Sequence, residues 1–276
     1  MDPYGSERRW YWVGTVVLAL GAFAMLLRSR GKPRDSEPHY VYHILVCLAA
    51  AVFYTFMGLD QLRVEIPEQT RHVYLARYVD WSITTPLLLA ALCTTALGEL
   101  RRRAALVVGI LVADVAIMGT GLAAALSHVQ GAKVTWYLVS CAFQLAVYAL
   151  IWGPLRREAT GQQSATVGAV FTRNATVLSV LWVLYPLVWL GAPEGFRLFE
   201  APTEALIFLV LDIIAKVGYG FMTLAGSAQL EPQSAHYRPV VEPITSLPPD
   251  PSSGRAGSER ERARERRELA GAGGGR

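Results

Sequence analysis

Seven long apolar stretches separated by short polar connections make up most of this chain. Each stretch is close to the roughly 20 residues that an α-helix needs to cross a bilayer. The stretches are Trp10–Leu27, Tyr40–Leu59, Val73–Leu92, Ala104–Leu126, Val134–Trp152, Val167–Leu190 and Ala205–Leu224. We therefore predict an all-α membrane protein, a seven-transmembrane helix bundle surrounded by membrane lipid, with its two ends on opposite sides of the bilayer.

Composition and charge predict how this bundle is oriented in the membrane. The chain is 53% hydrophobic and 17% charged, which is typical of a multi-pass membrane protein with a polar tail. Basic residues are more frequent in the connections after the first, third and fifth stretches than on the other side. By the positive-inside rule these connections and the C-terminus are cytoplasmic and the N-terminus is outside. The formal net charge of +4 then reflects topology and tail, so we do not expect nucleic-acid binding.

The chain divides into two parts by composition. Residues 1–226 hold all seven stretches, and residues 227–276 are rich in proline, glycine, serine and arginine. We expect the second part to be a disordered cytoplasmic tail with one short helix near Ser258–Leu269, either dispensable or binding a partner. Three cysteines fall within or beside the stretches without metal-ligand spacing, so no metal site is expected. Nothing in the pattern suggests an enzyme.

The seventh stretch contains two charged residues, Asp212 and Lys216. A charge at bilayer depth costs about 2.5–3.5 kcal/mol, so such residues are candidates for function. Residues four apart share a helix face, so both side chains point into the bundle. They form either a buried structural ion pair or a site in which the lysine amine carries Schiff-base chemistry.

The first stretch contains no buried charge, so we assign it a packing role. Three of the other stretches carry polar or aromatic residues on one face. Arg77, Asp80 and Thr84 lie at positions i, i+3 and i+7 of the third stretch and share one face. Trp182, Tyr185 and Trp189 repeat this spacing in the sixth stretch, as ordinary core or as the wall of a site for a flat apolar ligand. In the fourth stretch Asp114 stands alone, where a protonated carboxyl would bond to a neighbouring helix.

Three motifs occur in order along the chain: RYVDWSITTPLLL, LWVLYPLVWL and LDIIAKVGYGF. Together they resemble the microbial rhodopsins, most closely the bacteriorhodopsin branch, over roughly residues 10–226. The resemblance implies all-trans retinal buried in the centre of the bundle and bound covalently to Lys216 as a protonated Schiff base. It also implies assembly as a homo-oligomer, a trimer or a pentamer.

The resemblance assigns roles to the charged residues. Lys216 in its protonated linkage and Arg77 supply two positive charges. Asp80 and Asp212 supply two negative charges as the paired counterion, so the buried set is neutral, as low dielectric requires. Asp80 is implied to be the proton acceptor, with Thr84 hydrogen-bonded to it.

The remaining roles concern the chromophore and proton release. The residues implied to lie around retinal are Trp81, Thr85, Leu88, Asp114, Ile117, Ser140, Trp182, Tyr185 and Trp189, with Thr85 bonded to Asp114. Glu194 and Glu204, at the outer ends of the sixth and seventh stretches, match an external proton-release pair. Together these residues imply a light-driven outward proton pump.

One departure from the pumps with an internal proton donor leaves a second function open. Eleven residues beyond Asp80 these pumps have a carboxylic acid, and this chain has Ala91. Either the photocycle is slow, as in a sensory rhodopsin that signals through a transducer protein, or His43 assists proton uptake. Ala215, where transducer-coupled receptors carry a threonine, argues against the sensor. A chloride pump is disfavoured because Asp80 already supplies the negative charge that a halide would replace.

Overall fold

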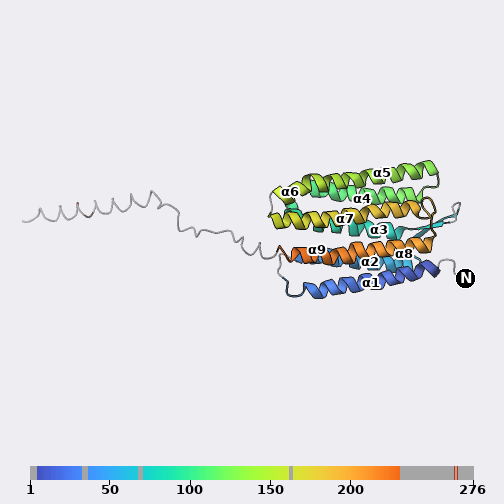
Figure 1. Ribbon diagram of the computed structural model, residues 1–276, viewed down its shortest axis with the longest axis horizontal. Coiled ribbons are helices and arrows are strands. Elements are labelled where there is room, and N and C mark those ends of the chain that lie inside the picture. The colour runs from blue at the N-terminus through green and yellow to red at the C-terminus, as the bar shows by residue number, and fades with distance from the viewer. Residues whose placement is uncertain are drawn as a thin grey trace, which may run out of the picture. The chain divides into compact units, whose positions relative to one another are not determined.

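The computed structural model describes residues 5–32, 37–67, 71–161 and 164–230, together with Arg264 and Arg266. Its helices are α1 (Gly5–Ser29), α2 (Glu37–Gly58), α3 (Leu75–Leu97), η3 (Leu100–Arg103), α4 (Ala104–Leu126), α5 (Gln130–Leu150), η4 (Ile151–Leu155), α6 (Arg156–Gly161), α7 (Ala165–Gly191), α8 (Ala201–Asp212), η5 (Ile213–Gly218) and α9 (Tyr219–Ser227). Figure 1 labels the α-helices. Within these residues seven helices are long and apolar enough to cross a membrane, so the predicted seven-helix bundle is confirmed.

Two of the seven spans are built from three consecutive elements. Gln130–Gly161 runs through α5, η4 and α6, and Ala201–Ser227 runs through α8, η5 and α9. The middle elements η4 and η5 are single wide π-helical turns. Such turns frequently occur at functional sites, and η5 contains Lys216.

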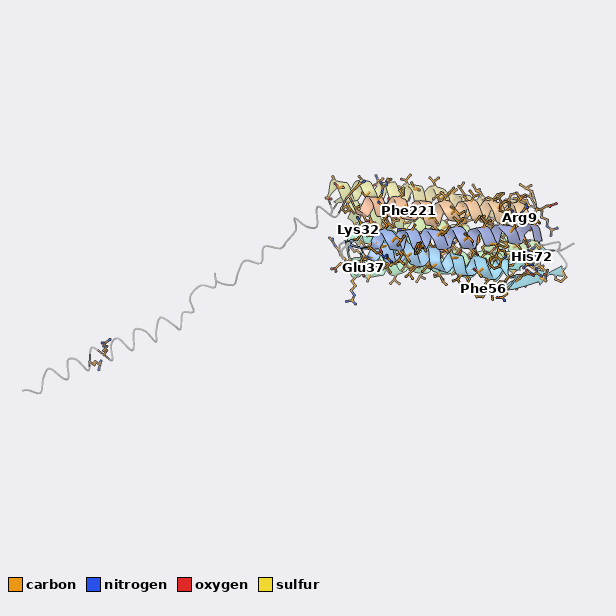
Figure 2. The ribbon with its side chains drawn as sticks, turned by 90° about the horizontal axis from the view of Figure 1, so that it is seen from below. Arg9, Lys32, Glu37, Phe56, His72 and Phe221 are labelled. Atoms are coloured by element: carbon orange, nitrogen blue, oxygen red, sulfur yellow. The ribbon has the colours of Figure 1, made fainter. Side chains whose placement is uncertain are left out.

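A two-stranded antiparallel hairpin, β1 (Arg63–Ile66) and β2 (Arg71–Tyr74), connects α2 to α3. The sequence predicts only a polar connection here, because strands of four residues are too short for their alternation of polar and apolar residues to be detected. The hairpin pairs Arg63 with Tyr74 and Glu65 with His72. Arg9 and His72 lie at one end of the bundle, named here the hairpin end, and Lys32 and Glu37 lie at the opposite end (Figure 2).

Burial identifies α3 as the inner helix of the bundle. In the most apolar window of each span, 67% of the α3 residues are buried, against 17% for the span containing α4 and 11% for that beginning with α5. Large apolar side chains such as Val112, Leu138 and Leu145 are exposed on the outer helices. This pattern is inverted relative to a soluble protein and fits helices that face lipid on their outer side.

The start of the first helix differs from the sequence prediction. Helix α1 begins at Gly5, before the apolar run, and its first turn contains the buried Glu7. The expectation that the first helix buries no charge is therefore wrong, because hydropathy does not register helix turns at the membrane edge. The predicted tail lies outside the described residues except for residues 227–230, Arg264 and Arg266, the last two of which are helical.

Candidate functional site

Lys216 lies at the centre of the site. Its side chain is 2% exposed and its ammonium Nζ pairs with two carboxylates, donating to Asp80 Oδ2 and lying 3.5 Å from Asp212 Oδ2. The two acids come from different helices, α3 and α8, so the sequence spacing of four explains only the contact with Asp212. A buried lysine between two buried carboxylates has the partners that its charge requires.

Two tyrosine hydroxyls hold the Asp212 carboxylate. Tyr185 donates to Oδ1 at 2.8 Å and Tyr54 donates to Oδ2 at 2.7 Å. Tyr54 comes from α2, and its role was not identified from the sequence. It lies three helical turns after His43 on the same helix, a spacing that would have placed it on the same inward face.

Asp80 is less completely bonded. Its Oδ2 accepts from Lys216, whereas its Oδ1 has no hydrogen-bond partner among the described residues. The expected hydrogen bond from Thr84 to Asp80 is present, and its acceptor is the backbone: the Thr84 hydroxyl donates to the Asp80 carbonyl oxygen at 2.9 Å. A threonine inside a helix commonly turns back to the carbonyl four residues earlier.

A largely apolar cavity adjoins Lys216. Eight of the residues expected around a chromophore line it beside Lys216: Trp81, Thr85, Leu88, Ile117, Ser140, Trp182, Tyr185 and Trp189. Asp212, expected as a counterion, also lines it, and seven further lining residues were not predicted to surround a chromophore: Tyr78, Met118, Gly121, Tyr137, Gln144, Pro186 and Ala215. Most of these are apolar or aromatic residues that carry no distinctive signal on a membrane helix.

Aromatic contacts keep the cavity walls in place. Tyr137 stacks on Trp189 with ring centroids 5.1 Å apart, and the indole Nε1 of Trp189 donates to Tyr78 at 2.9 Å. Trp81 meets Tyr185 edge to face at 5.4 Å. These contacts join α3, α5 and α7 around the cavity, so the walls are preformed.

Asp114 does not line this cavity, but it is hydrogen-bonded to Thr85, which does. The Thr85 hydroxyl donates to Asp114 Oδ2 at 2.7 Å, which connects α3 to α4. Ser140 Oγ donates to the Ile117 carbonyl at 2.9 Å and connects α4 to α5. Both bonds cross helix interfaces at depth, where an unpaired polar group is costly.

Toward the hairpin end, Arg77 forms an ion pair with Glu204. Its guanidinium also donates to the Tyr11 hydroxyl at 3.3 Å and lies 4.6 Å from the Phe208 ring centroid. Arg77, Glu194 and Glu204 all line a second cavity that opens at this end. We call this cavity the vestibule; it is polar where the first is apolar.

Toward the opposite end, His43 is fully buried. Its Nε2 lies 2.5 Å from the Thr223 hydroxyl of α9, and its ring packs edge-on against Tyr219 at 6.0 Å. His43 Nδ1 and the Tyr219 hydroxyl have no hydrogen-bond partner among the described residues. Ala91 is buried as well and brings no carboxyl to this region. The sequence analysis did not identify Thr223 or Tyr219.

Known proteins are similar to this chain in sequence and in fold. The bacteriorhodopsin of Haloterrigena sp. (strain arg-4) is 35% identical over 231 residues, which cover 82% of this chain and 90% of that protein. The thermophilic rhodopsin from Rubrobacter xylanophilus superposes with a TM-score of 0.77 at 32% identity, covering 81% of this chain and 97% of that one. The light-driven proton pump Coccomyxa subellipsoidea rhodopsin superposes with a TM-score of 0.74 at 29% identity, covering 80% and 96%.

The sequence profile of the bacteriorhodopsin-like protein family matches residues 6–230, which include every helix of the bundle. The fold, the buried lysine between two carboxylates and these similarities agree. The chain belongs to the bacteriorhodopsin-like family of microbial rhodopsins.

Proposed function

We propose that this protein is a light-driven outward proton pump that holds all-trans retinal on Lys216. The observation that carries the proposal is the position of the Lys216 amine, which adjoins the apolar cavity and lies between the carboxylates of Asp80 and Asp212. The similarity to the Coccomyxa rhodopsin, a light-driven proton pump, supports it.

The residues present fit retinal. A primary amine borders a cavity whose remaining wall is mostly aromatic and aliphatic, which suits a long apolar aldehyde that condenses with an amine. When bound, retinal supplies the absorption of visible light and the isomerisation that follows. Asp80 and Asp212 together balance the positive charges of the linked Lys216 nitrogen and of Arg77.

Asp80 is the proton acceptor in this proposal. Its Oδ2 is the nearest carboxylate oxygen to Lys216, and its Oδ1 has no partner among the described residues. Asp212 is stabilised as a carboxylate by the hydroxyls of Tyr54 and Tyr185. Both Asp212 oxygens already accept tyrosine hydroxyls, so among the described residues Asp80 offers the free carboxylate oxygen to a proton that leaves the Lys216 nitrogen.

Protonation of Asp80 removes one negative charge between Lys216 and Arg77. Arg77 is then drawn less toward the centre of the bundle and more toward Glu204, its ion-pair partner. A stronger positive field at the vestibule favours loss of a proton shared by Glu194 and Glu204. We propose that this proton leaves on the outer face, which places the N-terminus outside and the C-terminus in the cytoplasm.

Proton uptake must occur without a carboxylic donor at Ala91. His43 is a fully buried titratable group at that end, and its contact with Thr223 gives it a hydroxyl partner from α9. We assign it a role in returning a proton to the Lys216 nitrogen.

The second function, a phototaxis sensor acting through a transducer protein, is favoured by Ala91 alone. Ala215 offers no hydroxyl to Tyr185, whose own hydroxyl bonds to Asp212. Glu204 in contact with Arg77 gives the chain a proton exit that signalling does not need.

The test is light-driven acidification. Cells that express the full chain with retinal are illuminated in unbuffered medium, and the external pH is recorded with and without a protonophore. We expect a fall in pH that the protonophore abolishes and that Asp80→Asn, with its pigment still formed, does not show. A pigment that cycles without moving the pH would replace the pump with the sensor.

A further inference from the structure

A buried carboxyl outside the expected release pair lies in the first turn of α1. Glu7 is 2% exposed, as little as Lys216. A carboxylate withdrawn from water to this extent is costly unless charged or hydrogen-bonding groups compensate it. The residues around Glu7 therefore indicate whether this carboxyl stabilises the fold or takes part in proton release.

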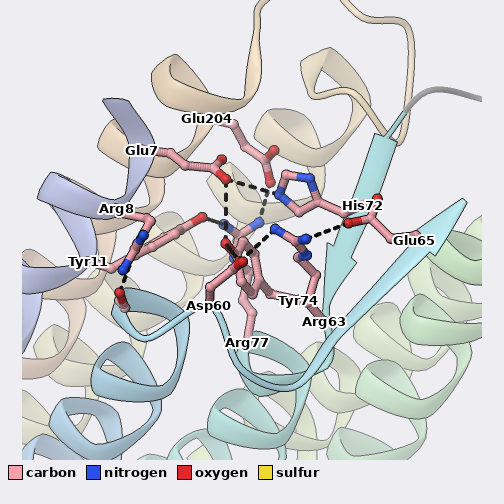
Figure 3. A network of polar contacts seen from close by, with 11 residues as sticks. Glu7, Arg8, Tyr11, Asp60, Arg63, Glu65, His72, Tyr74, Arg77 and Glu204 are labelled. Atoms are coloured by element: carbon pink, nitrogen blue, oxygen red, sulfur yellow. Dashed lines mark hydrogen bonds and ion pairs between the residues drawn. The ribbon is translucent and has the colours of Figure 1, made fainter. Parts of the chain in front are cut away.

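Two side chains from the hairpin contact one oxygen of the Glu7 carboxyl. His72 Nε2 of β2 lies 3.1 Å from Glu7 Oε1, and the Tyr74 hydroxyl lies 3.4 Å from the same oxygen (Figure 3). Tyr74 also donates to Asp60 at 3.0 Å, and its one hydrogen serves only one acceptor at a time. Burial, with the neighbouring Glu7 and Asp60 carboxylates, raises the pKa of Tyr74, so the hydroxyl keeps that hydrogen.

Glu7 is joined to the expected release pair by contacts and by a shared cavity. Tyr11, one turn further along α1, accepts a hydrogen bond from Arg77, which forms the ion pair with Glu204. The rings of Tyr11 and Tyr74 pack edge to face at 5.3 Å. Glu7, Glu194 and Glu204 all line the vestibule, and Figure 3 draws Glu7, Arg77 and Glu204 within one polar network.

We propose that Glu7 is a third carboxyl of the outward proton-release group and that His72 positions it. We call Glu7, Glu194 and Glu204 the release cluster. The inference rests on the proposed outward pump. In each cycle one proton leaves the cluster for bulk water, and the cluster keeps one additional negative charge beside Arg77 until Asp80 returns a proton to it.

A purely structural role is the competing interpretation, because the contact between Glu7 and His72 also fastens the hairpin to α1. The two roles differ in time. A fastening contact changes stability and leaves the timing of proton release unaltered. A proton-holding carboxyl changes the moment at which the proton appears in water.

The test uses the full chain with retinal in lipid nanodiscs. A soluble pH dye records proton release after a laser flash, and the visible absorption records proton transfer to Asp80. We expect Glu7→Gln to delay release by about tenfold or more, while transfer to Asp80 keeps its rate. Glu7→Asp should restore early release. Glu200→Gln, which removes an exposed carboxyl from the same vestibule, should leave release unchanged.

Infrared spectroscopy gives a second readout that does not depend on transport. The light-induced difference spectrum of the wild type should contain a carboxyl band that Glu7→Gln removes and Glu200→Gln retains. If Glu7→Gln forms no pigment, Tyr74→Phe tests the same point, because it removes the hydroxyl from Glu7 and should also delay release.

The outcomes separate the two proposals. If Glu7→Gln still releases its proton early and its infrared spectrum is unchanged, Glu7 has only a structural role. The proposed pump function is then unaffected. If that variant forms no pigment, unaltered release in Tyr74→Phe overturns the inference in the same way. A wild type that forms pigment and releases no proton overturns the pump itself and the inference with it.

Discussion

His43 of α2 and Thr223 of α9 lie 180 positions apart in the chain, and the imidazole Nε2 is 2.5 Å from the threonine hydroxyl. The pair lies on the side of Lys216 away from the hairpin end, where the chain has Ala91. The unpartnered His43 Nδ1 and Tyr219 hydroxyl, both buried, provide polar sites beside it among the described residues. A proton crossing this apolar half of the bundle would meet these groups.

We predict that His43→Ala slows the return of the proton to Lys216 by about tenfold or more, because a positioned acid or base typically contributes at least this much. Flash photolysis at several pH values measures the rate. Azide, a small weak acid, should restore it by carrying protons inward. A recovery rate equal to that of the wild type would remove His43 from the mechanism.

Lys216→Ala is expected to abolish covalent pigment, because no other residue offers an amine to the apolar cavity within the part of the chain described. Lys133→Ala is the matched control: this lysine is also buried, and its Nζ donates to the Glu194 carbonyl at 2.9 Å near the vestibule. Visible absorption and the mass gained after borohydride reduction measure attachment. A retinal adduct on Lys216→Ala would contradict the assignment.

Gly14→Ala should disturb the site from a distance. A Cβ at this position would lie 2.2 Å from the Tyr54 ring, and Tyr54 holds Asp212. We expect a shifted absorption maximum and a lower melting temperature of the pigment. Gly119→Ala has open space around its Cβ and should be neutral or stabilising by up to about 1 kcal/mol, as alanine is the better helix former. Equal behaviour of the two variants would show that Tyr54 adjusts without cost.

Thr85→Val is expected to cost about 1–3 kcal/mol, because it leaves the Asp114 carboxyl buried without its hydroxyl partner. Thr94→Val removes only a bond to the Ala90 carbonyl of its own helix and should cost less. Thermal denaturation of the two pigments measures the difference. Similar losses would mean that Asp114 finds another partner or water when Thr85 is removed.

The sequence by itself determined the seven spans and the motifs around Lys216, since these depend on local hydropathy and on residues close in the chain. It also indicated that Asp212 shares a helix face with Lys216, because helical periodicity is local. The contacts of Asp80 with Lys216 and of Arg77 with Glu204 were implied only by resemblance.

The tertiary structure alone decided which hydroxyls serve which acids. Tyr54 bonds to Asp212 across the bundle, whereas Thr84 turns back to its own helix and leaves Asp80 partly unbonded. It also brought Glu7 against His72 through a hairpin too short to detect. These pairings depend on how the helices pack against one another, and helix packing joins residues whose separation in the chain carries no periodic signal.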